Sequence, residues 1–236
     1  MSVSQKEINK NEPVFTAGEY LRSKNISFEI PQTLLMLPAA CFGAGLDGLS
    51  KKTYKLIGDI EVINDDLAVM HNFALGAPLC VLLAELAAVL GAKKFLLAGS
   101  AGALAEGLSF GDRVLCRGAY SEEGTSRHYV SEEYLPACGF DVLSALPVKA
   151  AGDSWTTDAF FRETKASVQA YREKGCLTVE MEASALFAFA KSRGFEAGAV
   201  FVISDLLYGG FWRPAQKNAQ TLKALRALVA DLIKIL

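Results

Sequence analysis

Short apolar runs alternate with helical patterns along most of the chain, and this alternation limits the possible folds more than any other feature. Strands that alternate with helices favour a largely parallel sheet with helices on both faces. We therefore predict an α/β fold with a single domain over residues 1–236. Its core is expected to be a mixed, mostly parallel, twisted sheet with helices on both faces. Residues 1–12 are polar and are expected to form a flexible tail.

Apolar runs and turn residues give the expected order of elements. They predict strands at residues 34–37, 93–98, 113–117 and 197–203, and a hairpin whose strands, 60–63 and 67–73, flank Asn64-Asp65-Asp66. Helix signals predict helices near residues 16–24, 78–90 and 215–236, and one that begins after Met181 and ends before Gly194.

Composition excludes several classes of protein. Hydrophobic residues make up 51% of the 236, which provides for a core and argues against disorder. A net charge of −2 offers no basic surface to nucleic acid or an anionic membrane. The first residues lack the apolar stretch of a signal peptide, which favours the cytoplasm. The five cysteines are scattered without a CxxC pair, so we expect free thiols, no metal site and no cofactor.

Three polar segments follow predicted strands, where ligands collect in open α/β sheets. They are residues 99–102, residues 180–182 and Ser204-Asp205. Glycines and a hydroxyl at 99–102 either form an anion-binding nest or an ordinary tight turn. Asp205 is either a turn or helix-capping residue, or a buried acid whose raised pKa lets it protonate a leaving group.

Two glutamates bracket Met181 at the entry to an apolar helix. Acidic residues near a helix N-terminus favour the helix dipole in any protein. The pair Glu180 and Glu182 after a buried strand also suits a sugar site. A carboxylate accepts hydrogen bonds from both vicinal hydroxyls of a ribose, and Met181 can pack on the apolar face of the sugar.

Two further segments are polar and are expected to be loops. Residues 122–129 read Glu-Glu-Gly-Thr-Ser-Arg-His-Tyr and suit a solvated loop. Residues 155–158 are expected in a second long loop, where Trp155 is either a core anchor or a platform on which a base stacks.

Together these segments resemble the nucleoside phosphorylase and nucleosidase family over about residues 55–210. Five landmarks in order carry the resemblance: Gly76-Ala77-Pro78, Gly99-Ser100-Ala101-Gly102, Glu123-Gly124-Thr125-Ser126, Val179-Glu180-Met181-Glu182-Ala183 and Ser204-Asp205. The third looks like the uridine phosphorylase branch, and the last looks like the purine-specific branch.

The resemblance implies a role for each site residue. Glu182 would bind the ribose hydroxyls, Met181 would pack on the sugar, and Asp205 would protonate a purine ring nitrogen as the base leaves. Gly99 and Ser100 match the phosphate-binding loop. The remaining substrate contacts implied are Glu180, Ser204 and Trp155.

Two departures from the family pattern concern phosphate. Phosphorylases of the family carry an arginine where this chain has Leu97, and a Gly-Asp-Pro turn that residues 38–45 lack. Charge-assisted contacts to phosphate are therefore fewer, and Arg127 is the candidate replacement.

We favour a phosphorylase that cleaves a purine ribonucleoside with phosphate. A nucleosidase that uses water, a uridine-specific phosphorylase and a non-catalytic binding or storage protein remain alternatives. The resemblance also implies a homo-oligomer, either a dimer or a hexamer.

Overall fold

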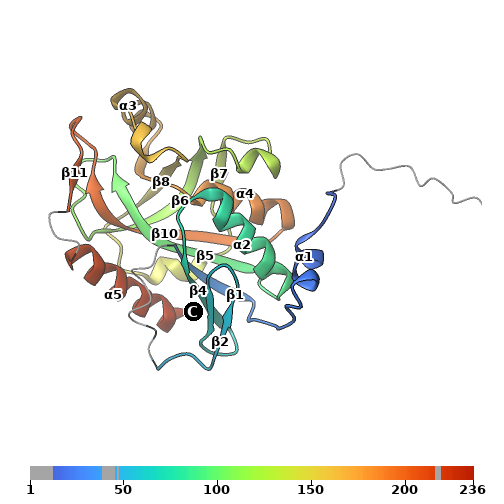
Figure 1. Cartoon of the computed structure of the whole chain (residues 1–236). Coiled ribbons are helices and arrows are strands. Elements are labelled where there is room, and N and C mark those ends of the chain that lie inside the picture. The colour runs from blue at the N-terminus through green and yellow to red at the C-terminus, as the bar shows by residue number, and fades with distance from the viewer. Residues whose placement is uncertain (1–12, 39–45, 47, 216–218) are drawn as a thin grey trace, which may run out of the picture.

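The computed structural model describes residues 13–38, 46, 48–215 and 219–236 (Figure 1). The predicted tail at 1–12 lies outside the described residues. Helices are α1 Ala17–Ser23, α2 Ala77–Val89, α3 Lys165–Glu173, α4 Ala183–Arg193 and α5 Ala219–Ile235, with short 3-10 helices η2 Ser126–His128, η3 Asp141–Ala145 and η4 Phe160–Arg162. Strands are β1 Thr33–Pro38, β2 Lys52–Lys55, β3 Asp59–Val62, β4 Leu67–Phe73, β5 Lys94–Ala103, β6 Arg113–Ser121, β7 Tyr134–Pro136, β8 Ala150–Thr156, β9 Cys176–Glu180, β10 Glu196–Leu206 and β11 Arg213–Pro214.

The strands form one mixed sheet in the order β11-β10-β6-β8-β9-β5-β1-β4-β3-β2, with β7 beside β6. The prediction of a mostly parallel sheet is not confirmed: β1 runs parallel to β4 and β5, but β10 is antiparallel to β6, and β5 to β9. Short turns rather than helices join β2 to β3, β3 to β4 and β10 to β11, and such connections produce antiparallel pairs.

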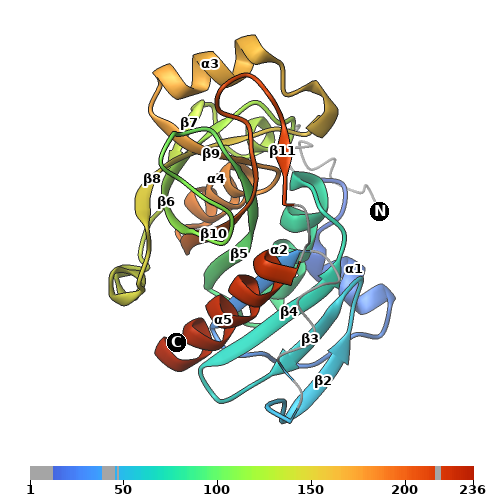
Figure 2. The same ribbon diagram turned by 90° about the vertical axis from the view of Figure 1, so that its left-hand side faces the viewer.

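Part of the sheet closes on itself. Strand β10 pairs with β5 as well as with β6, and β9 connects β8 to β5. Strands β5, β10, β6, β8 and β9 therefore form a ring, and β1 continues from β5 toward the β2–β3–β4 meander. Figure 2 shows α3 and β11 at one end of the molecule and β2 at the other.

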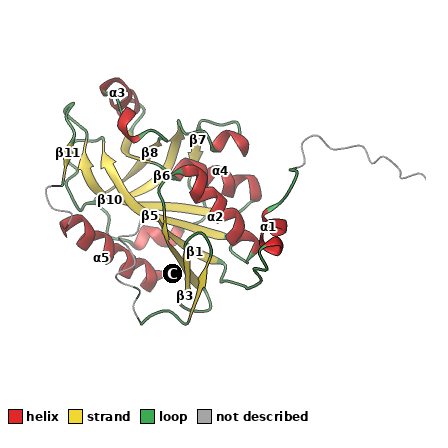
Figure 3. Ribbon diagram, in the orientation of Figure 1, coloured by secondary structure: helices red, strands yellow, loops and turns green. Residues whose placement is uncertain are grey.

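Helices cover both faces of the sheet, as predicted (Figure 3). Alternate side chains of a strand point to opposite faces. In β1, Leu34 and Met36 therefore pack with the buried residues of α2 and α4, whereas Leu35 and Leu37 pack with those of α5. Helix α2 is apolar nearly all round, which suits its position over the sheet.

Local signals position the elements close to their predicted bounds. The Thr16 side chain caps α1 in a capping box with Glu19. Asn64 turns the predicted hairpin, because its Oδ1 accepts the amides of Asp66 and Leu67 at 2.8 and 2.7 Å. Helix α4 ends at Gly194, whose φ of +67° suits glycine. None of the described helices has the length and apolarity that a membrane crossing requires.

Candidate active site

Strand register brings the predicted segments together around Gly102. Gly102 of β5 lies beside Asp205 of β10 on one side and beside Val179 of β9 on the other. The cavity there has a volume of about 80 Å³ and is lined by Leu75, Ser100, Ala101, Gly102, Phe160, Glu163, Val179, Glu180, Met181, Glu182, Ser204 and Asp205. Six of the nine predicted site residues line it: Ser100, Glu180, Met181, Glu182, Ser204 and Asp205.

Glu182 is a buried carboxyl that does not cap its own helix. It occupies the N-cap position of α4 but makes no capping hydrogen bond. Its Oε1 instead accepts the Gly76 amide at 2.6 Å, which ties the start of α2 to the site. Burial, and then the nearby charge of Glu180, raise the pKa of Glu182 to about 8. Glu182 therefore has an incompletely paired carboxyl in the cavity.

Glu180 performs the helix-capping role. Its Oε2 accepts the amides of Glu182 and Ala183 at 2.8 and 2.7 Å, the first free amides of α4. Its Oε1 accepts the hydroxyls of Ser154 and Thr156 in β8. Although burial raises the pKa of Glu180, these four donors stabilise its charged form. Glu180 thus holds the start of α4 against β8. A substrate would have to compete with four protein donors for the oxygens of Glu180.

Asp205 projects from a bulge in β10. Ile203 pairs with Ala101 and Asp205 with Gly102, so Ser204 is the extra residue that redirects the strand. The Oδ1 of Asp205 accepts the Ser204 hydroxyl at 2.7 Å, and Oδ2 accepts the Trp212 indole N–H at 3.2 Å. Burial raises the pKa of Asp205, and these two hydrogen bonds oppose the rise. Asp205 is therefore a buried carboxyl at the cavity whose two oxygens are held in place.

Residues 99–102 do not form the loop that the sequence predicts. Strand β5 continues to Ala103, and β10 pairs with this whole stretch. A Cβ on Gly102 would clash with Leu207 Cδ1 and would lie 3.0 Å from Asp205 Oδ2. Close strand packing therefore explains the glycine better than an anion nest does. Ser100 lines the cavity, while Gly99 is buried in the strand before it.

Trp155 lies in β8 rather than in a loop, and that prediction is wrong. Its side chain is 1% exposed, stacks on Tyr171 with ring centroids 4.5 Å apart, and donates to Glu122 at 2.7 Å. It is a core anchor that does not line the cavity. The sequence analysis missed the aromatic residues near the cavity, Phe160 and Trp212, which lie in connections without a recognisable motif.

Arg127 is exposed in η2 and does not line the cavity. The buried Glu123 carboxylate organises this loop by accepting the amides of Thr125 and Ser126 and the hydroxyls of Ser121 and Ser184. The loop after β1 that lacks Gly-Asp-Pro falls at 39–45, outside the described residues.

Glu163 is a second acid that the sequence analysis missed. It follows η4 and lines the cavity with Asp205. Burial, and then the charge of Asp205, raise its pKa to about 7. No landmark of the sequence marks Glu163, because only the path of the connection between β8 and α3 brings it to the cavity.

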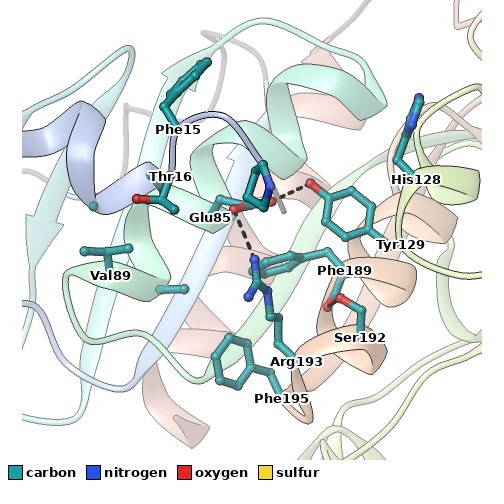
Figure 4. A pocket seen from close by; sticks show the side chains of 14 residues that line it. Phe15, Thr16, Glu85, Val89, His128, Tyr129, Phe189, Ser192, Arg193 and Phe195 are labelled. Atoms are coloured by element: carbon teal, nitrogen blue, oxygen red, sulfur yellow. Dashed lines mark hydrogen bonds and ion pairs between the residues drawn. The ribbon is translucent and has the colours of Figure 1, made fainter. Parts of the chain in front are cut away.

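A larger cavity of about 820 Å³ lies between α1, α2 and α4 (Figure 4). At its centre Glu85 accepts the Tyr129 hydroxyl at 2.6 Å and lies 3.6 Å from Arg193. None of the nine predicted site residues lines it.

Comparison with known proteins identifies the family of the chain. A model of the phosphorylase superfamily matches residues 67–235, and the chain belongs to this family of enzymes. It is 32% identical to the guanosine phosphorylase of Halorubrum lacusprofundi over 78% of this chain and 79% of that protein. It is 30% identical to the uridine phosphorylase of Thermococcus kodakarensis over 69% of this chain and 64% of that protein. The crystal structure of uridine phosphorylase from Vibrio fischeri has a similar fold, with a TM-score of 0.72 at 20% identity over 88% of this chain and 92% of that one.

Proposed function

We propose that the chain is a nucleoside phosphorylase that cleaves the N-glycosidic bond of a purine ribonucleoside with phosphate, giving free base and ribose 1-phosphate. The observation that carries the proposal is the pair of buried carboxyls, Glu182 and Asp205, in one cavity. A guanosine phosphorylase among the relatives supports a purine substrate. We also propose that phosphate is the co-substrate, that the enzyme uses no metal or cofactor, and that it is cytoplasmic.

The two carboxyls suit the charges that develop during glycosidic cleavage. The transition state resembles an oxocarbenium ion, so positive charge develops on the sugar and negative charge on the leaving base. Ribose hydroxyls would donate to Glu182, draw it into its charged form and stabilise the sugar. Protonated Asp205 would donate to the imidazole-ring nitrogen of the purine, so that the base leaves neutral.

The nucleophile is the second element of the proposal. The relatives named above are phosphorylases, which favours phosphate, and Ser100 offers it a hydroxyl at the cavity. However, none of the described residues that line the cavity is basic, and Leu97 replaces the family arginine. These observations make a nucleosidase that uses water the second candidate.

One assay separates the candidates. Protein is incubated with inosine, adenosine, guanosine or uridine, with and without phosphate, and free base is measured. Release only with phosphate supports the proposal; release without it identifies a nucleosidase. Turnover of uridine alone identifies a uridine phosphorylase, and no release identifies a binding protein.

Asp205→Asn tests the acid role. We expect kcat/KM on inosine to fall about a hundredfold or more, as for a lost general acid. The loss should largely vanish on 7-methylinosine, whose ring is already cationic. Equal activity of Asp205→Asn and the parent on inosine would contradict the role.

Assembly into a homo-oligomer is also part of the proposal. Helix α2 leaves Leu82 and Val89 about half exposed, and oligomerisation would cover such residues. Light scattering across a concentration series measures the oligomeric state.

A further inference from the structure

Glu163 is fixed beside the candidate acid by the start of α3. It directly precedes Thr164, whose hydroxyl oxygen caps α3 by accepting the Ser167 amide at 3.1 Å. Glu163 lines the cavity that contains Asp205, and it also lines a neighbouring cavity of about 250 Å³ that Trp212 borders. Two carboxyl groups from different elements, β10 and the η4–α3 connection, therefore share one partly buried space.

The two carboxyls differ in their hydrogen-bond donors. Asp205 accepts from Ser204 and from Trp212, and donors of this kind favour the charged form of a carboxyl. Within residues 13–38, 46, 48–215 and 219–236, no hydrogen bond or ion pair reaches the Glu163 carboxyl. A single proton shared by the two groups therefore rests more favourably on Glu163.

The surrounding charges support the same distribution. Glu180 and Glu182 also line the shared cavity: four donors stabilise the charged form of Glu180, whereas the raised pKa of Glu182, about 8, favours its neutral form. Lys165 and Arg172 border the neighbouring cavity, but the Lys165 amino group lies 5.3 Å from the Phe211 ring centroid and Arg172 pairs with Glu106 at 3.1 Å. Two carboxylates in one partly buried space cannot both ionise without cost. Burial, and then the charge of Asp205, raise the pKa of Glu163 to about 7.

We propose that Glu163 and Asp205 hold one proton between them, that it rests on Glu163 in the empty site, and that it passes to Asp205 as the base leaves. The inference rests on the proposed function for its last step only. Glu163 acts through Asp205 and is thus a positioning residue for the proton.

The step moves a single proton. Glu163 passes its proton to the ionised Asp205, which gives the same proton to the ring nitrogen of the base as the C–N bond breaks and its electrons stay with the base. A phosphate oxygen forms the new bond to the anomeric carbon, and the phosphate proton is lost to solvent. Both carboxyls are then ionised, and solvent returns one proton before the next turnover.

Glu163→Gln tests the role by comparing two substrates. On inosine at pH 7 we expect kcat/KM to fall about tenfold or more, with the high-pH decline in activity moved to lower pH. On 7-methylinosine, which needs no proton, activity should stay within about twofold. Glu133→Gln, at an exposed position, is the matched control and should leave both substrates unchanged. Equal losses on both substrates, or an unchanged pH profile on inosine, would overturn the proposal.

Carbon-13 NMR of the side-chain carboxyls tests the shared proton without any substrate. In the ligand-free protein we expect a carboxyl that titrates near pH 7 and disappears in Glu163→Gln. Titration of Glu163 near the ordinary glutamate value of about 4.3 would overturn the inference. If the parent protein releases no base from any nucleoside, the proposed function fails, and this titration still decides whether the pair holds a proton.

Discussion

Glu180 and Glu182 are two residues apart and of the same type, yet their oxygens have different partners. Glu180 accepts four protein donors, whereas Glu182 accepts the Gly76 amide and faces the cavity. Their spacing in the sequence shows two acids before a helix and does not show which one caps it. The backbone decides, because the amides of Glu182 and Ala183 point back at Glu180.

The first prediction concerns Glu182. If its carboxylate accepts the ribose hydroxyls, Glu182→Gln should lower kcat/KM on inosine, since a charged hydrogen bond is lost. The loss of transition-state stabilisation should be roughly 2 kcal/mol. The loss should be smaller on 2′-deoxyinosine, which lacks one of the two hydroxyl donors. Steady-state kinetics on both substrates measure the difference. A similar loss on both would remove Glu182 from the ribose site.

At the scale of elements, the site depends on the register of β5 against β10 and β9. Gly102 lies between them: an added Cβ would clash with the Leu207 side chain and would press tightly against Asp205 and Val179. The bulge at Ser204 then sets the direction in which Asp205 points. A shift of one residue in either ladder would separate the acid from the cavity.

The second prediction follows from this packing. Gly102→Ala should destabilise the protein by about 1–3 kcal/mol, because the added Cβ forces the Leu207 side chain to move and crowds Asp205 and Val179. It should also reduce turnover, since the acid is displaced. Gly99→Ala is the control for stability, because its Cβ would meet neighbours only at 3.8 Å and beyond. Thermal unfolding compares the two, and equal melting temperatures would contradict the packing argument.

The sequence predicts the elements better than their pairing. Apolar runs and turn residues predicted β1, β10 and the β3–β4 hairpin, and three of the predicted polar segments contribute residues to one cavity. Local pattern could not show that β5 runs on through residues 99–102, because only pairing with β10 keeps two glycines extended. Nor could it show that Trp155 faces the core, since Trp suits a strand or a loop equally well.

At the scale of the whole molecule, buried acids make stability depend on pH. Glu182 has a folded pKa of about 8, above that of the unfolded chain, so the folded state holds a proton that the unfolded state loses. Its contribution to stability is complete below about pH 4.5 and is lost as the pH rises through about 8.

The third prediction compares melting temperatures of the parent and Glu182→Gln between pH 5 and pH 9. Glutamine cannot ionise, so the free energy of unfolding of the variant should rise relative to that of the parent as the pH rises, by roughly 4 kcal/mol at most. This corresponds to several degrees or more in a chain of this size. Parallel curves for the two proteins would show that Glu182 titrates normally.

The ring of β5, β10, β6, β8 and β9 has a consequence for how the molecule opens. A sheet with two free edges frays from them, whereas a closed ring can exchange its ladder amides with solvent only when two of its strand pairs part together. Amides paired between Gly102 and Asp205 should therefore be among the slowest to exchange for deuterium. The β2–β3 edge and the two-residue strand β11 should exchange early. Because the candidate site lies on the strands whose amides should exchange most slowly, it stays assembled while the rest of the chain fluctuates.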